Sequence, residues 1–193
     1  QEYVMKNEVY LRHIENYRDH WWFQSRKNII EKIIKKNAKK KKLKILDFGS
    51  GSGVNLSMLS KYGHVSIFET HKETQKYLKN LYKGTKFQVI NSLNTHKFDL
   101  ILMADVLEHI KNDKKQIKLL SKILKKNGKI LLTVPAFKYL FTHKDIILGH
   151  YRRYNIREIK EIFKKFRVLK LTYFNFFLFV PIALSLIFFK ILK

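Results

Sequence analysis

The sequence contains no cysteine, and among its 193 residues only two are proline and seven are glycine. Without cysteine the chain can form neither disulfides nor thiolate metal sites, which agrees with a reducing cytosol. So few prolines and glycines leave no room for a low-complexity linker. Because 46% of the residues are hydrophobic, the chain can instead build one domain with a substantial core.

Acidic side chains are scarce as well, since 15 Asp and Glu stand against 40 Lys and Arg and give a formal net charge of +25. A field of this sign attracts nucleic acid or anionic lipid. Most of the positive charge is lysine, however, mixed with many Ile, Asn and Phe residues, as an AT-rich genome would encode. Runs such as Lys39–Lys42 also fall where a loop or helix end is expected. We therefore interpret the charge mainly as solvated surface.

Apolar, β-branched runs alternate with longer amphipathic stretches along the chain. The runs cover residues 44–49, 64–70, 85–91, 98–104, 129–135 and 167–174. The amphipathic patterns lie at about 26–38, 54–62, 71–82, 112–126 and 155–166, the last opened by a capping box of Asn155 and Glu158. Strands that are apolar on nearly every residue are covered on both faces. The alternation predicts an α/β fold with a doubly wound, mostly parallel sheet, whose ligands bind at the C-terminal ends of the strands.

The first apolar run leads into the loop "DFGSGSG" (47–53), which has a glycine at every second position. Glycines let the backbone approach a ligand and turn sharply into the next helix. The dinucleotide fingerprint G-x-G-x-x-G/A needs a small residue where this chain has Val54. The negative charge of Asp47 would also repel a pyrophosphate. A ligand without phosphates and with a cationic amino acid end therefore fits better.

The loop resembles the first motif of the class I S-adenosylmethionine (SAM) dependent methyltransferases, an acid followed by G-x-G-x-G, whose fold is Rossmann-like. The resemblance implies that Glu69, at the end of the second run, accepts hydrogen bonds from both ribose hydroxyls. Directly after the fourth run, "DVLEH" (105–109) matches the D-x-x-E-H of many small-molecule methyltransferases. The cofactor contacts that the resemblance implies elsewhere are Asp47, Gly49, Gly51, Gly53, Ser92, Leu93, Ala104 and Asp105.

Two further segments, "HWWFQSRK" (20–27) and "VPAFKYLFTHKDIILGHYRRY" (134–154), resemble a bacterial and archaeal subgroup of these enzymes. In that subgroup the N-terminal segment lies over the SAM pocket. The resemblance thus implies that Trp22 or Phe23 lines the site and that Arg26 reaches the SAM carboxylate. The alternatives are that the tryptophans only cover the sheet and that Arg26 is a solvated charge.

Methyl transfer from a sulfonium is an in-line displacement, which a general base assists when the nucleophile is a hydroxyl or an ammonium. The candidate catalytic residues are His109, His143, Asp145 and His150. The resemblance places His109 close to the sulfonium, and the pKa of histidine suits a base near neutral pH. Helix capping or packing is the alternative role for His109.

Arg152 and Arg153 are candidates to bind a substrate phosphate or carboxylate. Adjacent residues do not face the same way, so we expect one of the two to enter the pocket. Tyr154 is a third substrate-binding candidate, with packing as its alternative role.

Ubiquinone-type O-methyltransferases use a similar E-H motif to bind a metal, which raises Asp105, Glu108 and His109 as ligands. That ligand set is incomplete, and we expect no metal. Enzymes that methylate the amino groups of nucleic acid bases carry [DNS]-P-P-[YF] after the fourth strand, to clamp a flipped base. This chain has Ala104–Leu107 there instead, so we do not expect a nucleic acid substrate.

Residues 173–193 contain a near-continuous apolar run of sixteen residues, Phe174 to Phe189, followed by Lys190 and Lys193. A membrane-spanning helix needs about twenty residues, and Pro181 interrupts the run. The segment instead suits the membrane interface, with lysines on anionic headgroups. A dimer interface or a core helix is the alternative. In this fold a seventh strand normally follows the sixth, and the sequence offers no candidate for it.

These patterns predict three parts: an N-terminal helical segment over the cofactor pocket (1–42), a SAM-binding core (43–172) and the apolar C-terminal segment (173–193). The expected reaction is transfer of a methyl group from SAM to an oxygen or nitrogen of a small or lipid-linked acceptor. The N-terminal residues lack the apolar region of a secretory signal. We therefore expect a cytoplasmic protein that is peripheral to the inner face of a membrane. Its C-terminal segment is expected to contact lipid, and a homodimer is the alternative. The alternatives are a nicotinamide-dependent oxidoreductase and a non-catalytic basic protein that binds membrane or RNA.

Overall fold

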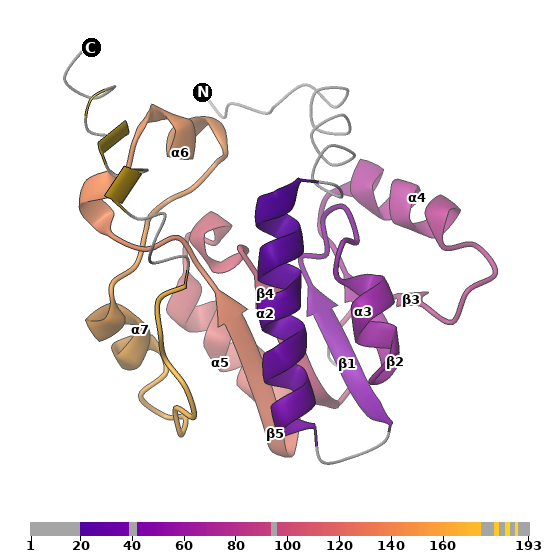
Figure 1. The fold of residues 1–193 in the computed structure, drawn as a ribbon. Helices are drawn as coiled ribbons and strands as arrows, with labels where there is room; N and C mark the ends of the chain where they lie inside the picture. The colour runs from indigo at the N-terminus through magenta and orange to yellow at the C-terminus, as the bar shows by residue number, and fades with distance from the viewer. Residues whose placement is uncertain are drawn as a thin grey trace. The chain divides into compact units, whose positions relative to one another are not determined.

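The computed structural model describes residues 20–38, 42–93, 96–174, 180–181, 184–185 and 188. Helices, two short 3₁₀ turns and strands follow one another along these residues. In chain order they are α2 (Trp21–Asn37), β1 (Leu43–Phe48), α3 (Leu56–Ser60), β2 (Gly63–Phe68), α4 (Lys72–Leu81), β3 (Gln88–Val89), β4 (Phe98–Ala104), η1 (Leu107–His109), α5 (Asp113–Ile123), β5 (Leu124–Thr133), η2 (Lys138–Leu140), α6 (His143–Ile147) and α7 (Ile156–Ile162) (Figure 1).

The chain divides into two compact units. Of the described residues, the sheet unit holds those up to residue 104 together with 120–133. The loop unit holds 105–119 and the residues from 134 onwards.

The sheet unit is built on a parallel sheet with the strand order β3-β2-β1-β4-β5. The chain moves outward in one direction from β1 to β3 and then returns to β4 on the other side of β1. β1 is therefore the switch point at which ligands bind in doubly wound folds. Both neighbours pair with Asp47, which stands opposite Ile67 on β2 and Leu102 on β4. This arrangement confirms the predicted doubly wound, mostly parallel α/β fold.

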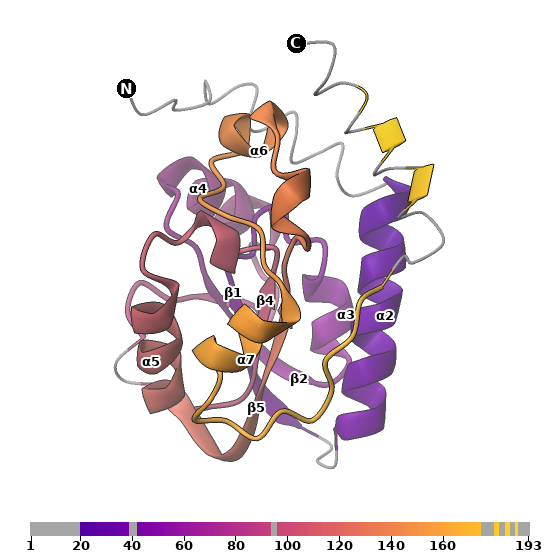
Figure 2. The same cartoon turned by 90° about the vertical axis from the view of Figure 1, so that its left-hand side faces the viewer.

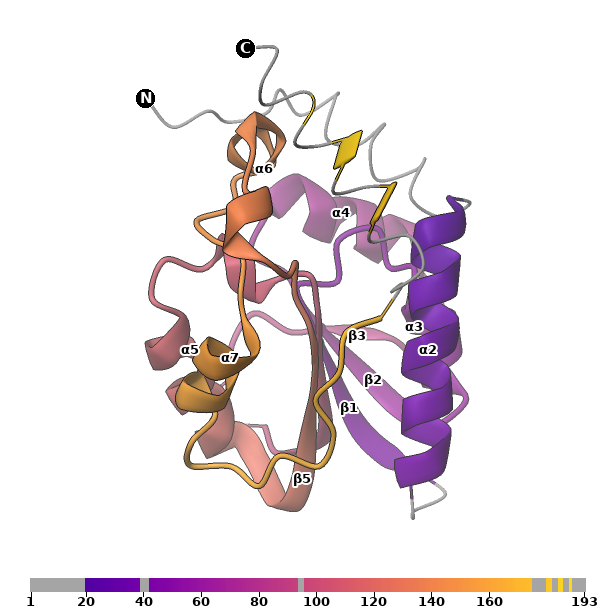
Figure 3. The same cartoon turned by 60° about the vertical axis from the view of Figure 1, so that its left-hand side comes forward.

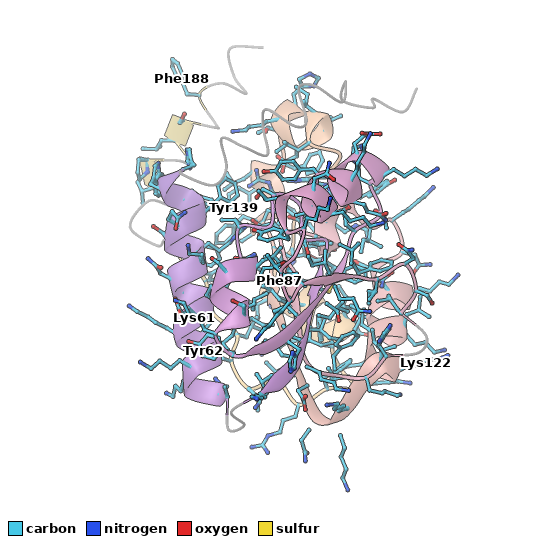
Figure 4. All side chains as sticks on the ribbon, turned by 90° about the vertical axis from the view of Figure 1, so that its right-hand side faces the viewer. Lys61, Tyr62, Phe87, Lys122, Tyr139 and Phe188 are labelled. Carbon is cyan, nitrogen blue, oxygen red and sulfur yellow. The ribbon has the colours of Figure 1, made fainter. Side chains whose placement is uncertain are left out.

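One face of the sheet is covered by α2 and α3 (Figures 2 and 3). Every fourth residue of α2 is buried, and two of these residues, Ile30 and Ile34, join a core cluster with side chains from β1, α3, β2, α4 and β4. Lys61, which is labelled in Figure 4, directly follows α3 and forms an ion pair of 3.0 Å with Glu31 of α2. At the C-terminal end of α2 the Lys129 Nζ donates to the Asn37 carbonyl at 3.0 Å. These contacts and the two buried isoleucines hold the C-terminal half of α2 against the sheet unit.

Five of the six expected strands are present, but their bounds differ from the prediction. β3 is two residues long, and β5 begins at Leu124, five residues earlier than expected. The sixth predicted strand, 167–174, is wrong: no strand is formed there. Three of its large side chains, Val168, Leu169 and Tyr173, are exposed, so no burial holds the segment in a ladder.

The C-terminal prediction falls largely outside the described residues. The described positions of this segment beyond residue 174 are helical, and their side chains are exposed. Within the part of the chain that the structure describes, no helix is both long and apolar enough to cross a membrane.

Candidate functional site

The glycine loop, residues 49–53, joins β1 to α3 by a tight turn. All three of its glycines have positive φ, at 72° for Gly49, 51° for Gly51 and 72° for Gly53. The loop is closed by a 2.9 Å hydrogen bond from the Gly53 N–H to the Ser50 carbonyl. Such backbone angles are costly for residues with a Cβ. The sequence pattern G-x-G-x-G is therefore required by the turn itself.

Two of these glycines have different surroundings. A Cβ on Gly53 would meet side-chain atoms of Leu56 at 2.9 Å and Leu78 at 3.0 Å, so Gly53 packs the loop against the core. Among the described residues, a Cβ on Gly51 would meet nothing within 4 Å. No described side chain therefore fills the space over Gly51, as a loop that binds a ligand requires.

Glu69 follows β2, and its side chain turns to the glycine loop. Its Oε2 accepts a 3.1 Å hydrogen bond from the Gly51 N–H. Its Oε1 accepts from the N–H groups of Thr70 and His71 at 2.8 and 3.0 Å. The residue is 8% exposed. A carboxylate has about four acceptor positions, so three backbone bonds fix Glu69 in place and leave capacity for a ligand hydroxyl.

Asp47, at the C-terminal end of β1, is almost fully buried, with 1% of its surface exposed. Burial, and next the nearby charge of Glu69, raise the pKa of Asp47 to about 7, although a hydrogen bond with Ser50 and the charge of Arg26 act in the opposite direction. Among the described residues, no group donates a hydrogen bond to its Oδ2. The first strand therefore ends in a carboxylate that a cationic ligand group would stabilise.

α2 brings the predicted N-terminal residues into the sheet unit. His20 caps the helix, since its ring accepts from the Trp22 N–H at 3.3 Å. Arg26 is 4% exposed, and its guanidinium lies 4.9 Å from the centre of the Phe23 ring. The alternative of a solvated charge is therefore wrong for Arg26. Trp22 and Phe23 are half-buried, whereas Trp21 is 53% exposed.

The remaining predicted cofactor residues lie in loops or at strand ends. Ser92 is exposed and Leu93 half-buried, and both follow β3 without regular structure. Ala104 is the last residue of β4. Asp105 comes next, with a φ of 55°. A non-glycine residue in this region marks a backbone held by its surroundings, as is often found at functional sites.

In the loop unit, Asp145 joins two other predicted residues. Its carboxylate accepts hydrogen bonds from the Arg153 Nε and Nη2, each at 2.9 Å, and lies 2.9 Å from the His150 Nδ1. It also accepts from the Thr142 N–H at 2.9 Å, which forms a capping box for α6. Burial alone raises the pKa of Asp145, but the hydrogen bonds from Arg153, Thr142 and His150 lower it further than burial raises it. Because both oxygens are engaged, Asp145 suits orienting His150 better than removing a proton.

Arg152 and Tyr154 bind a different carboxylate, Asp113, at the start of α5. The Arg152 Nη1 and the Tyr154 hydroxyl donate to the Asp113 Oδ2 at 2.9 and 3.2 Å. The Tyr154 hydroxyl also lies 3.2 Å from the Leu107 carbonyl. Burial, followed by the charge of Asp113, raises the pKa of Tyr154. The two adjacent arginines thus face different carboxylates, as expected of neighbours, and Asp113 is a member that sequence reasoning missed.

The histidines of the loop unit separate into two kinds. The rings of His109 and His150 meet edge to face, with centres 4.6 Å apart. Burial, followed by the neighbouring His150, lowers the pKa of His109 below its usual 6.5. His143 is exposed at the start of α6, and no hydrogen bond or ring contact joins it to this pair among the described residues.

Glu108, His109 and His150 each place a potential ligand atom within 4.8 Å of the other two. The sequence had suggested Asp105, Glu108 and His109 as a ligand set. In the described structure the third member of the group is His150 instead of Asp105. No sequence signal joins His150 to residues some forty positions earlier, because the contact depends on how the loop after α6 returns.

A family model described as "Methyltransferase domain" matches residues 17–166. No curated protein sequence matches this chain significantly.

Several solved structures have the same fold. One is the YcgJ protein from Bacillus subtilis, with a TM-score of 0.59 and 17% identity over 70% of this chain and 66% of that chain. Another is an S-adenosylmethionine-dependent methyltransferase from Clostridium acetobutylicum, with a TM-score of 0.52 and 21% identity over 59% of this chain and 51% of that chain. A third is the plantazolicin methyltransferase BpumL in complex with SAH, with a TM-score of 0.64 and 18% identity over 86% of this chain and 72% of that chain. The chain thus spans just under two thirds of the first structure and about half of the second. At these identities the likeness shows the fold.

Proposed function

The chain belongs to the methyltransferase-domain family whose model covers residues 17–166, and we propose that it transfers a methyl group from SAM to an oxygen or nitrogen of a small or lipid-linked acceptor. One observation carries the cofactor assignment. The Glu69 carboxylate, directly after β2, is fixed 3.1 Å from the backbone nitrogen of Gly51, and no described residue fills the space over that glycine. A ribose hydroxyl and a flat adenosyl group suit this combination of acceptor and bare backbone.

The amino acid end of SAM carries one negative and one positive charge. We assign its carboxylate to Arg26 and its ammonium to Asp47, both of which are buried in the sheet unit. Arg26 presents a planar set of donors, which suits a carboxylate. Bringing an ammonium to Asp47 would favour the ionised form of a carboxyl whose pKa is otherwise raised to about 7. The family match and this charge pattern both favour SAM over the nicotinamide cofactor of the alternative.

We assign activation of the acceptor to the loop unit, which gathers His109 and His150. Asp145 fixes His150 through its Nδ1, so that the opposite ring nitrogen is directed to a ligand. Arg152 and Arg153 are engaged by Asp113 and Asp145. We therefore expect them to support the site's shape more than to bind a free anion.

We further propose that the protein binds its acceptor at an anionic membrane surface on the cytoplasmic side. The exposed side chains of Val180, Leu184 and Phe188 are spaced four residues apart in the described part of the C-terminal segment. Residues at this spacing share one face of a helix. Lys190 and Lys193 follow in the sequence, and the net charge of +25 favours anionic lipid. A nucleic acid substrate is not part of this proposal.

The cofactor assignment is tested by calorimetry with SAM, SAH and NAD. Wild-type protein should bind SAM and SAH but not NAD. Glu69→Gln should weaken SAH binding about 10- to 100-fold, because charged hydrogen bonds contribute roughly 1.5–3 kcal/mol. Glu73→Gln on α4 is the matched control and should bind normally.

Because three backbone N–H groups donate to Glu69, each variant is also checked by circular dichroism and urea unfolding. A folded Glu69→Gln protein that binds SAH as tightly as wild type would contradict the assignment. Tight binding of NAD without binding of SAM would overturn the proposed function altogether.

A further inference from the structure

We propose that Glu108, His109 and His150 bind a divalent transition metal ion. All three residues belong to the loop unit, where η1 supplies the first two and the loop after α6 supplies the third. Their potential ligand atoms lie within 4.8 Å of one another. Metal–ligand bonds of about 2.0–2.2 Å hold ligand atoms roughly 3–3.5 Å apart. The ligand atoms would therefore have to approach one another by up to roughly 1.3–1.8 Å around an ion, which changes of side-chain rotamer can supply.

The donor set selects the class of metal. Two imidazole nitrogens and one carboxylate oxygen suit Zn²⁺, Co²⁺, Mn²⁺ or Fe²⁺, whereas Mg²⁺ and Ca²⁺ prefer sites made of oxygen alone. The chain has no cysteine to add a thiolate. Three protein ligands also leave positions open for water or an acceptor oxygen, as in catalytic rather than structural metal sites.

The surroundings hold the ligands in suitable orientations. Asp145 lies 2.9 Å from the His150 Nδ1, which leaves the Nε2 of that ring for the ion. Arg153 in turn fixes Asp145 with two hydrogen bonds of 2.9 Å. A carboxylate behind a ligating histidine is the usual arrangement at metal sites. The Tyr151 N–H donates to the Glu108 carbonyl at 2.8 Å, which links the two ligand segments through the backbone.

Burial differs among the three ligands in a way that suits a catalytic ion. Glu108 is fully buried, so its carboxylate is held in a fixed position at the inner side of the site. His109 is the most solvent-accessible of the three residues and His150 is half-buried, so an ion could enter from solvent on the histidine side. The imidazole of His109 is nevertheless partly covered, because it packs against the His150 ring.

The role of the ion, but not its binding, rests on the proposed function. An ion held by Glu108, His109 and His150 would lower the pKa of an acceptor hydroxyl, which would then release its proton to solvent more readily. In the methyl transfer itself the acceptor oxygen would bond to the methyl carbon as the sulfur–carbon bond breaks. The sulfur would keep the electron pair of that bond and leave as the neutral thioether of SAH.

The test uses the full chain without a histidine tag, freed of metal by a chelator and dialysis. Zn²⁺, Mn²⁺ and Mg²⁺ are titrated by calorimetry, and Co²⁺ is followed by its visible absorption, which reports nitrogen ligands. We expect one Zn²⁺ or Co²⁺ per chain, bound more tightly than Mg²⁺. Glu108→Gln and His150→Asn should weaken binding at least about 100-fold, and Asp145→Asn about 10- to 100-fold.

His64→Asn, an exposed histidine on β2, is the control and should bind metal as wild type does. His109→Asn removes an exposed ligand with little effect on packing, so the test survives if the buried variants misfold. Equal binding by wild type and His109→Asn, or no stoichiometric binding by wild type, would overturn the proposal. SAH titrations on the same samples separate the two ideas: metal binding without SAH binding would refute the proposed function alone, and the reverse would refute the metal site alone.

Discussion

Asp47 is the residue whose ionisation the fold alters in a way that can be measured. The strand that ends in this carboxyl is buried on both sides, and the Glu69 carboxylate adds a like charge nearby. The charge of Arg26 offsets only part of this cost, so the pKa rises from 3.8 to about 7. Without a ligand, Asp47 is therefore largely protonated at mildly acidic pH.

This shift predicts how stability depends on pH. Between the unfolded pKa of 3.8 and the folded pKa of about 7, the native state holds a proton that the unfolded chain releases. The contribution of Asp47 to the free energy of unfolding should therefore fall as pH rises through this window, by at most about 1.4 kcal/mol per pH unit. Asp47→Asn cannot titrate and should lose that slope. Urea unfolding at pH 5, 6, 7 and 8 measures the difference between the two proteins.

Glu161→Gln, which changes an exposed carboxylate on α7, serves as the control and should run parallel to wild type across this window. If the curves of Asp47→Asn and wild type also ran parallel, Asp47 would not carry a raised pKa.

The positions of residues could be predicted from sequence where the topology alone fixes them. A carboxylate that follows the second parallel strand must lie near the loop that follows the first, and Glu69 does. The roles of Asp145 and Asp113 could not be predicted in this way. Their partners come from a loop without periodicity, so only tertiary contacts decide which arginine meets which carboxylate.

Among the elements, α2 connects the predicted N-terminal segment to the sheet. Its buried positions are Arg26, Ile30 and Ile34, which are spaced four residues apart and so share one face. The two isoleucines belong to the hydrophobic core, and Arg26 is the residue to which we assign the SAM carboxylate. The helix can therefore position Arg26 only as long as the two isoleucines stay packed.

Ile30→Ala tests this dependence. Ile30 has no exposed surface, and removing a buried isoleucine side chain costs about 2–5 kcal/mol. We expect a loss of this size in the free energy of unfolding, measured with urea, and weaker SAH binding as Arg26 loses its support. Asn28→Ala, on the exposed face of the same helix, should change neither quantity. A stable Ile30→Ala protein would mean that α2 is not held to the sheet by its apolar face.

Strand prediction succeeded where burial and pairing act together. β1 and β4 are buried over most of their length and lie within one residue of their predicted bounds. The run at 167–174 has the same β-branched character but is not buried. A pattern of apolar residues indicates that a strand can form, and only a neighbouring strand and a covering layer make it form.

At the scale of the whole molecule, the charge and the apolar C-terminal segment lead to the same prediction. The protein should sediment with vesicles containing anionic lipid and much less with zwitterionic vesicles, and added salt should release part of it. Leu184→Glu and Phe188→Glu should each reduce the bound fraction, because a carboxylate resists transfer into the interface. Leu119→Glu makes the same change at an exposed leucine of α5 and is the matched control.

Analytical ultracentrifugation of the same variants covers the alternative of a homodimer. Unchanged vesicle binding, together with a dimer that Leu184→Glu dissociates, would assign the segment to a protein interface and not to lipid.

The backbone of Asp105 has a practical consequence for anyone who engineers this protein. Its φ of 55° has no steric cost for glycine, whereas aspartate, although it adopts this region more readily than most residues, does so at a cost in conformational energy. A screen that selects only for heat resistance should therefore enrich Asp105→Gly. If this carboxylate contributes to turnover, the selected variants would be thermally stable but would turn over substrate slowly. Selection for thermal stability therefore has to be combined with selection for activity.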